Sequence, residues 1–205
     1  MLQLLQTSTA APAPTSAATP TLLPPVRPAK RAYTLAAATP RHVPAITTIY
    51  RTQIEDGLGS HEDPLPDAAE MARRLAELQA QGLPAFVALD ERRVVRGFTW
   101  ATPFRFRAHY RHTVEDSIHI HPSARRQGVG EALLRRLVDA CAERGYRQMI
   151  AVVGDSRNRA SIALHEKLGF QPCGYFPAIG RRPGEWCDTV MLQRALGAEG
   201  ATPAV

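Results

Sequence analysis

The sequence predicts a mixed α/β domain in which helices cover both faces of a central, mostly antiparallel sheet. Three observations lead to this fold class. Short apolar runs typical of strands alternate along the chain with stretches that repeat apolar residues at helical spacing. Hairpin-like pairs of strands come first, and two strands that are each followed by a helix come later. With 205 residues, of which 44% are hydrophobic, the chain is long enough for one sizeable core.

The folded domain is expected over residues 32–196. Residues 1–31 consist mainly of Ala, Pro and Thr, which offer little to bury, so we expect a disordered tail there and a second flexible tail at 197–205. The first segment lacks the basic start and continuous apolar run of a secretory signal, and we expect a cytoplasmic protein. No apolar run approaches the roughly 20 residues that cross a bilayer, so no membrane partner is expected.

The first half of the chain is predicted to hold two helices among its strands. Asp67 is placed to cap the second helix, and Gly82 to end it. The predicted elements are a strand at 33–35, a helix from Arg41 to Glu55, a loop over 56–66, a helix after Asp67, hairpin strands at 85–89 and 94–102, and a strand at 113–121.

The second half is predicted to alternate strands with helices before a closing pair of strands. Its long helix carries Val129, Leu133, Leu137 and Cys141 on one stripe, and Gly145 ends it. The predicted elements are that helix from Gly128 to Arg144, a strand at 149–153, a helix from Asn158 or Arg159 to Leu168, and strands near 171–176 and 186–193.

Charge and cysteine content narrow the class of ligand. The net charge is +6, but the basic residues are scattered and aromatics make up only 6%, which argues against nucleic acid and favours a small acidic molecule. Cys141, Cys173 and Cys187 have no CxxC spacing, so we expect neither a disulfide framework nor a metal site, and each should be a small, partly buried apolar residue.

A glycine-punctuated turn is the strongest functional signal. Arg125-Arg126-Gln127-Gly128-Val129-Gly130 joins the strand ending at His121 to the long helix. Unpaired amides at a helix start hold phosphate or pyrophosphate, and glycines let the backbone come close to it. On its own, a pattern of this size favours an ordinary strand-to-helix turn with basic residues facing water. It lacks the GK[ST] ending of a P-loop, which argues against nucleotide hydrolysis.

A second signal lies at the start and along the face of the next helix. Asn158 is well placed as its N-cap, with Ser161 three residues later, and capping alone would explain the asparagine. His165 follows on the same helix, where a lone histidine is more often structural than catalytic. Neither feature assigns a function without further context.

In these motifs the chain resembles the GNAT superfamily of N-acetyltransferases. The matching pieces are, in order, a strand, Arg125-x-x-Gly128-x-Gly130, a helix, a strand, Asn158, a helix and Leu168-Gly169-Phe170. The chain also resembles the phosphinothricin and methionine sulfone/sulfoximine acetyltransferase branch, through Tyr110-x-x-Thr113-Val114-Glu115, Leu164-His165-Glu166-Lys167-Leu168-Gly169-Phe170 and Gly184-Glu185-Trp186-Cys187-Asp188. The similarity covers about residues 32–196, a single GNAT-like domain.

The resemblance implies acetyl-CoA as co-substrate, no metal and a homodimer. The pyrophosphate would rest on the amides from Arg126 to Glu131, beside the charges of Arg125 and Arg126. The cofactor arm would pair with the backbone of Ile118, His119 and Ile120. The residues implied for cofactor binding are therefore Ile118, His119, Ile120, Arg125, Arg126, Gln127, Gly128, Val129, Gly130, Glu131, Asn158 and Ser161.

The resemblance also implies the catalytic and substrate-binding residues. Glu115 would be the base that deprotonates the amine, and His165 would lie near the thioester as acid or base. Arg105, Arg107 and Tyr110 would hold the acid groups of an amino-acid analogue, because the arginine fork binds carboxylate or phosphinate. A surface carboxylate and an exposed Arg-rich loop are the alternatives for these residues.

The implied function is acetyl-CoA-dependent N-acetylation of a small acidic amino-acid analogue of the phosphinothricin or methionine sulfone/sulfoximine type. Two alternatives remain open. One is acetylation of another amine, such as a protein N-terminus, a polyamine or an aminoglycoside, although cationic acceptors would favour an acidic pocket over Arg105 and Arg107. The other is a non-catalytic acyl-CoA-binding module, against which Glu115 and His165 both speak.

Overall fold

The computed structural model describes residues 32–57, 62–182 and 184–197. The predicted N-terminal tail lies outside these residues, as does the predicted C-terminal tail apart from Gly197. Within the described part, no helix is long and apolar enough to cross a membrane. No group of His, Cys, Asp or Glu in the same residues is arranged to hold a metal ion.

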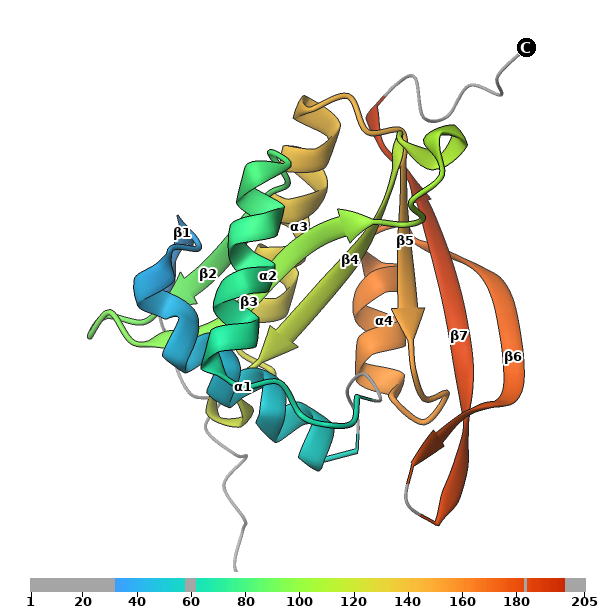
Figure 1. Ribbon diagram of the computed structural model, residues 1–205, viewed down its shortest axis with the longest axis horizontal. Coiled ribbons are helices and arrows are strands. Elements are labelled where there is room, and N and C mark those ends of the chain that lie inside the picture. Colours follow the sequence, from blue (N-terminus) through green and yellow to red (C-terminus); the bar gives the residue numbers. More distant parts are fainter. Residues whose placement is uncertain (1–31, 58–61, 183, 198–205) are drawn as a thin grey trace, which may run out of the picture.

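The described residues form seven strands, four α-helices and three short 3-10 helices (Figure 1). The strands are β1 (Thr34–Ala37), β2 (Ala85–Leu89), β3 (Val95–Pro103), β4 (Thr113–Ile120), β5 (Gln148–Val153), β6 (Gln171–Arg182) and β7 (Glu185–Ala195). The α-helices are α1 (Val43–Glu55), α2 (Ala68–Ala80), α3 (Val129–Glu143) and α4 (Arg159–Lys167), and the 3-10 helices are η1 (Pro40–His42), η2 (Ala108–Tyr110) and η3 (Pro122–Ala124).

The seven strands make one sheet in the order β1-β2-β3-β4-β5-β7-β6. Only the β4–β5 pair is parallel, which confirms the predicted mostly antiparallel mixed sheet. Helices α1 and α2 lie on one face, and α3 and α4 on the other (Figure 1). The predicted fold class, a single α/β domain with helices on both faces, is confirmed.

Most predicted elements agree with the structure to within one or two residues. As expected, the Asp67 carboxylate caps α2 by accepting a hydrogen bond from the Glu70 amide at 2.8 Å. The closing strands are the exception, because β6 continues to Arg182 rather than ending at Phe176. Its pairing register with β7 shifts between Phe176 and Gly180, and Ala178 has a φ of 52°. This irregularity breaks the alternation of side chains that would have marked a long strand.

The main core is apolar and lies between the sheet and its helices. The predicted stripe of α3 is buried: Leu133, Leu137 and Cys141 are fully enclosed, and Val129 is nearly so. Burial of such side chains is the dominant stabilising term of the domain. The expectation that all three cysteines are partly buried is wrong for Cys173, which is exposed on the edge strand β6, whereas Cys187 is buried.

The parallel pair β4–β5 parts before β4 ends, and this split positions the site. Its pairing runs only from Thr113 opposite Gln148 to Asp116 opposite Ala151. Beyond that point β4 stays paired with β3 alone. The amide of His121 donates to the Arg96 carbonyl at 2.9 Å, so backbone groups at odd-numbered positions face β3. The backbone groups of Ile118 and Ile120 therefore face the gap.

Candidate active site

A cleft of about 740 Å³ opens where β4 and β5 part. Its size is in the range of small-molecule and cofactor sites. The end of β4, the turn before α3, the end of β5 and the inner face of α4 line it. Of the predicted site residues, those in the lining are Glu115, Ile118, His119, Ile120, Arg125, Arg126, Gly128, Gly130, Glu131, Asn158, Ser161 and His165.

The turn before α3 has the backbone geometry of an anion site. Gly128 is the N-cap of α3 with a φ of 86°, a left-handed conformation that favours glycine. Arg126 has a φ of 61°, which is uncommon for a residue with a side chain. The turn thus brings the amides at the start of α3 to the cleft, at the positive end of the helix dipole.

The second glycine has a different role from the one the sequence suggests. At Gly130 an added Cβ would come within 3.2 Å of Leu164 Cδ2 on α4 and 3.6 Å of Ile120 Cγ1 on β4. Gly130 therefore lets α3 pack closely against α4 and β4. At Gly128 an added Cβ would meet nothing within 4 Å, so the backbone conformation is what requires that glycine.

Two predicted residues of the turn do not line the cleft with their side chains. Gln127 accepts a hydrogen bond from the Tyr33 hydroxyl and donates to the Ser123 carbonyl, which ties the residue before β1 to the turn. Val129 packs in the core. The prediction of a cofactor contact for these residues can hold only through their backbone amides. Arg125 faces the cleft but also bonds Asp56 Oδ2 at 3.0 Å, so part of its charge is balanced.

Asn158 and Ser161 face the cleft from the start of α4. The Asn158 side-chain oxygen accepts a hydrogen bond from the Ser161 amide at 3.1 Å, as expected of an N-cap. Lys167, the last residue of α4, forms an ion pair with Glu131 in the first turn of α3, and both residues line the cleft. Because Glu131 is paired with Lys167 and Arg135, its charge near the anion site is partly balanced.

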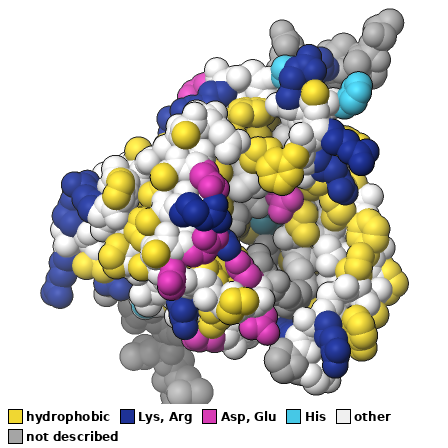
Figure 2. All heavy atoms as spheres, viewed as in Figure 1, with side chains coloured by type: hydrophobic (Ala, Val, Ile, Leu, Met, Phe, Trp, Pro, Cys, Tyr) yellow, Lys and Arg dark blue, Asp and Glu magenta, His cyan; other side chains and the backbone are white. Residues whose placement is uncertain are grey.

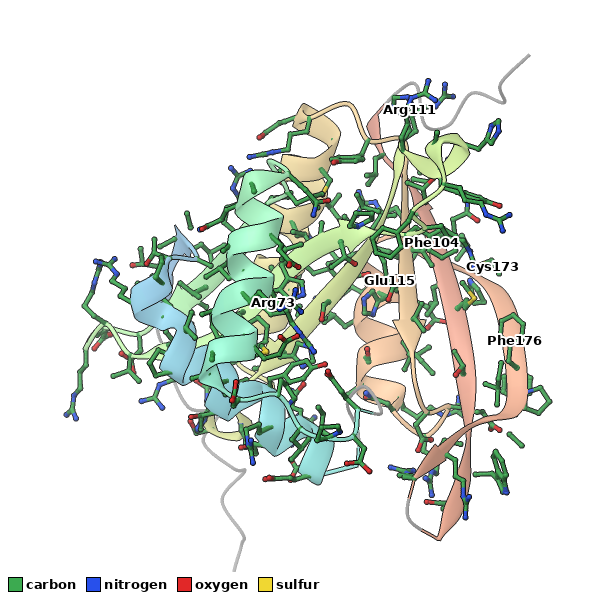
Figure 3. All side chains as sticks on the ribbon, viewed as in Figure 1. Arg73, Phe104, Arg111, Glu115, Cys173 and Phe176 are labelled. Carbon is green, nitrogen blue, oxygen red and sulfur yellow. The ribbon has the colours of Figure 1, made fainter. Side chains whose placement is uncertain are left out.

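Glu115 is half-buried at the point where the strands part (Figure 3). Burial, and then the neighbouring Asp116 carboxylate, raise the pKa of Glu115 to about 7, against an opposing effect of the Arg105 guanidinium. A carboxyl group with such a pKa is half ionised near neutral pH and can accept a proton there. A half-buried carboxyl group with a strongly raised pKa in a cleft is a candidate for a catalytic base.

His165 is buried in the wall of the cleft, with only 2% of its surface exposed. Its Nε2 lies 3.0 Å from Asp116 Oδ2, and its Nδ1 lies 2.8 Å from the Ser161 carbonyl oxygen. Burial lowers its pKa, but the charge and hydrogen bond of Asp116 outweigh burial, and the pKa is raised overall. Both ring nitrogens are thus engaged within the protein, which conflicts with the predicted direct acid or base role of His165.

The predicted substrate clamp lies in the loop after β3, outside the residues that line the cleft. Phe104 bonds back to Thr113 at 3.2 Å, near Glu115 (Figure 3). Arg105 lies over the Phe104 ring at 5.1 Å, and Tyr110 meets the same ring edge-on at 6.0 Å. Arg105 is close enough to Glu115 to affect its pKa, whereas Arg107 is exposed with no such link.

Sequence reasoning missed three polar residues that also line the cleft, namely Gln53, Asp116 and Ser117. Asp116 is 7% exposed, and its Oδ1 has no hydrogen-bond donor among the described residues. His119 bonds Gln53 of α1 at 2.7 Å and Ser117 at 2.9 Å. Asp116 and His165 are separated by 49 positions, and His119 and Gln53 by 66, so no local spacing could have revealed either pair.

The split sheet, the helix start beside it and the carboxyl group at its base form the arrangement that the resemblance to N-acetyltransferases implied. The sequence profile of the Acetyltransferase (GNAT) family matches residues 46–170 of this chain. The chain therefore belongs to that family. It is 43% identical to a phosphinothricin N-acetyltransferase from Alcaligenes faecalis over 78% of this chain and 81% of that protein.

A second curated relative and a solved structure agree with this assignment. An L-methionine sulfoximine/L-methionine sulfone acetyltransferase from Salmonella typhimurium is 32% identical over 78% of this chain and 92% of its own. A GNAT phosphinothricin acetyltransferase from Sinorhizobium meliloti, crystallised with acetyl-CoA, superposes with a TM-score of 0.80 at 44% identity, covering 84% of this chain and 93% of that one. Within the family, the chain falls in the phosphinothricin and methionine sulfoximine acetyltransferase branch.

Proposed function

We propose that this enzyme transfers the acetyl group of acetyl-CoA to the amine of a small acidic amino-acid analogue, of the phosphinothricin or methionine sulfone/sulfoximine type. The observation that carries the proposal is Glu115, a half-buried carboxyl group with a pKa of about 7 at the base of the split. The curated relatives of the same branch support the choice of acceptor.

Two parts of the cleft support acetyl-CoA as the bound co-substrate. Amides at the start of α3 and the side chains of Arg125 and Arg126 would hold the pyrophosphate. The gap-facing backbone of Ile118 and Ile120 would pair with the amide groups of the cofactor arm. On the same wall of the cleft, Asp116 Oδ1 is a buried hydrogen-bond acceptor that has no donor among the described residues. Bound acetyl-CoA supplies the activated acetyl group.

Glu115 would accept the proton that the attacking amine must lose. An amine attacks only as the neutral base, so a nearby group that is ionised at neutral pH assists it. A backbone N–H group of Ile118 or Ile120 that the cofactor arm leaves unpaired could stabilise negative charge that develops on the acetyl oxygen. We infer that His165 is a positioning residue, which holds Asp116 beside Glu115 and thereby influences the pKa of the base.

The acceptor side supports an acidic substrate. Arg105 lies near Glu115, and Arg107 and Tyr110 follow in the same exposed loop. A guanidinium group can hold carboxylate or phosphinate through two hydrogen bonds and would direct the amine toward Glu115. Cationic acceptors such as polyamines or aminoglycosides would be repelled by these arginines. A binding module without catalysis would have no need for the raised pKa of Glu115.

A panel assay tests the proposal. The protein is incubated with acetyl-CoA and phosphinothricin, methionine sulfone, methionine sulfoximine, free amino acids, a polyamine and an N-terminal peptide, while thiol release is measured. Turnover should be fastest with the acidic analogues. Acetyl-CoA binding without turnover on any amine would support the non-catalytic alternative, and faster turnover of the polyamine or peptide would support another acceptor.

We also propose a homodimer in the reducing cytoplasm. The β6–β7 hairpin carries exposed apolar side chains along the sheet edge, namely Tyr175, Phe176, Ile179 and Trp186 (Figure 2). Such a patch is a typical protein–protein contact surface. Light scattering should give twice the chain mass, and Ile179→Arg should reduce it to one chain; an unchanged mass would place the contact elsewhere. The three free cysteines suit a reducing compartment.

A further inference from the structure

Ser117 lies two residues after Glu115 on β4 and lines the same cleft. Side chains two positions apart on a strand share a face and are separated by about 7 Å. A small amine therefore fits between the Glu115 carboxyl group and the Ser117 hydroxyl. The hydrogen-bonding direction of that hydroxyl depends on residues behind it.

Three hydrogen bonds fix this direction. The Gln53 side-chain nitrogen donates to the Ile120 carbonyl at 3.0 Å, so the Gln53 oxygen is the acceptor that faces His119. His119 Nδ1, at 2.7 Å, must then carry the proton and donate to Gln53. In a neutral imidazole, Nε2 is left as an acceptor, and the Ser117 hydroxyl donates to it at 2.9 Å.

His119 is held in the neutral form. It is 4% exposed, and burial lowers its pKa to about 3. Its ring stacks on Phe98 with centroids 4.9 Å apart and contacts Tyr50 at 4.8 Å. These contacts restrict the ring from turning, and they exclude water from it, which is why burial disfavours its protonation.

We propose, on the basis of the proposed function, that the Ser117 hydroxyl accepts a hydrogen bond from the substrate amine and so orients it toward Glu115, with His119 and Gln53 as positioning residues. Because its own hydrogen is bound to His119, the hydroxyl presents only lone pairs to the cleft. Glu115 takes the proton that the amine loses, and the Ser117 proton stays in place. No covalent bond to Ser117 forms.

The arrangement has the order of a Ser-His-acid triad, but its physical chemistry opposes nucleophilic catalysis. A triad histidine must become an imidazolium while the serine attacks, and a buried carboxylate stabilises that cation. Here Gln53 carries no charge, and the buried ring resists protonation. Ser117 is therefore an amine-binding group rather than an attacking one.

Steady-state kinetics on Ser117→Ala and His119→Phe test the proposal, with phosphinothricin and methionine sulfone as acceptors. Loss of one oriented hydrogen bond should lower kcat/KM for the acceptor about tenfold in either variant. The affinity for acetyl-CoA, measured by calorimetry, should not change. Ser117→Thr keeps the hydroxyl and should recover most of the activity.

Thr99→Val is the matched control. Its hydroxyl is buried and donates to the Ser117 carbonyl at 2.8 Å, so this variant removes a neighbouring hydrogen bond without touching the Ser117 side chain. Its kcat/KM should stay within about twofold of the unaltered enzyme. An equal loss in Thr99→Val would mean that strand disorder, not amine binding, explains the Ser117 effect, and would overturn the proposal.

Three further results would overturn it. Unchanged kcat/KM in Ser117→Ala would show that the hydroxyl does not bind the amine. Acetylated Ser117, detected by mass spectrometry after incubation with acetyl-CoA, would make it a nucleophile. A shift, in His119→Phe, of the pH range over which activity rises would show that His119 itself titrates during catalysis. If the unaltered enzyme acetylates none of the amines, the proposed function itself fails, which is distinct from these outcomes.

Discussion

The two halves of the cleft are built in different ways. The donor half consists of backbone groups from contiguous segments, namely the gap-facing end of β4 and the turn before α3. The proposed acceptor half consists of side chains from β4 and α1, among them Glu115 and Gln53, and Arg105 of the β3–β4 loop lies near Glu115 but outside the cleft lining. Backbone recognition depends on conformation, whereas the acceptor half depends on the charge and hydrogen-bonding direction of each side chain.

Because the two halves are built differently, we expect each half to control different kinetic and binding quantities. Changes in the donor half should alter the affinity for acetyl-CoA and leave the pH dependence of turnover in place. Changes in the acceptor half should alter turnover, the pH dependence or the acceptor KM and leave acetyl-CoA binding intact. Four tests, in order of decreasing expected effect, probe this separation.

Replacing the base should have the largest effect. Glu115→Gln keeps the size of the side chain but cannot accept a proton, so kcat should fall by about 10²- to 10⁴-fold. In the unaltered enzyme, activity should rise with pH through about 7, because Glu115 acts when deprotonated. That acid limb should disappear in the variant while calorimetry gives an unchanged acetyl-CoA affinity. Turnover equal to that of the unaltered enzyme would remove Glu115 from the mechanism.

Breaking the buried Asp116–His165 pair should lower the unfolding free energy of the protein and also change the pKa of Glu115, the proposed base. Asp116→Ala leaves His165 without its partner, and loss of one member of a buried pair costs about 3 kcal/mol of unfolding free energy, measured in urea. Because the Asp116 charge raises the pKa of Glu115, the acid limb should move to lower pH.

The exposed Asp139 of α3 supplies the control for this experiment. Asp139→Ala should change the unfolding free energy by no more than about 0.5 kcal/mol. Its acid limb should stay in place. An acid limb that stays fixed in Asp116→Ala as well would show that Asp116 does not tune the base.

The same contrast explains what could be predicted from the sequence. Periodicity, caps and glycines are local signals, and they predicted most of the helices and strands, the turn at Gly128 and the N-cap at Asn158. His165, the partner of Asp116, and Gln53, one of the two partners of His119, come from distant segments brought together by folding, and no spacing in the chain encodes them. His165 was placed in the site by resemblance, but its burial and its two partners became visible only in the structure.

Replacing Arg126 should have a smaller effect, which is limited to the affinity for acetyl-CoA. Its φ of 61° is costly for any residue with a Cβ, so Arg126→Gly should not lower thermal stability. Loss of its charge should weaken acetyl-CoA binding by about threefold to tenfold, with a smaller effect at high salt.

Arg93 is a matched control for this substitution. It is an exposed arginine with a φ of 62° in the β2–β3 turn, away from the cleft lining. Arg93→Gly should relieve the same backbone conformation and leave the acetyl-CoA affinity unchanged. An equal loss of affinity in both variants would indicate a general charge effect instead of a contact at the anion site.

The smallest expected effect distinguishes the two arginines of the acceptor loop. Arg105 lowers the pKa of Glu115, so Arg105→Ala should move the acid limb of the pH profile slightly upward. Arg107 has no such link, and Arg107→Ala should raise only the KM for an acidic acceptor, by about tenfold or less if a single charged hydrogen bond is lost. If both variants raise KM and only Arg105→Ala moves the limb, Arg105 acts on both substrate and base. If neither changes KM, the loop does not bind the acid group, and the specificity of the acceptor half must come from other residues.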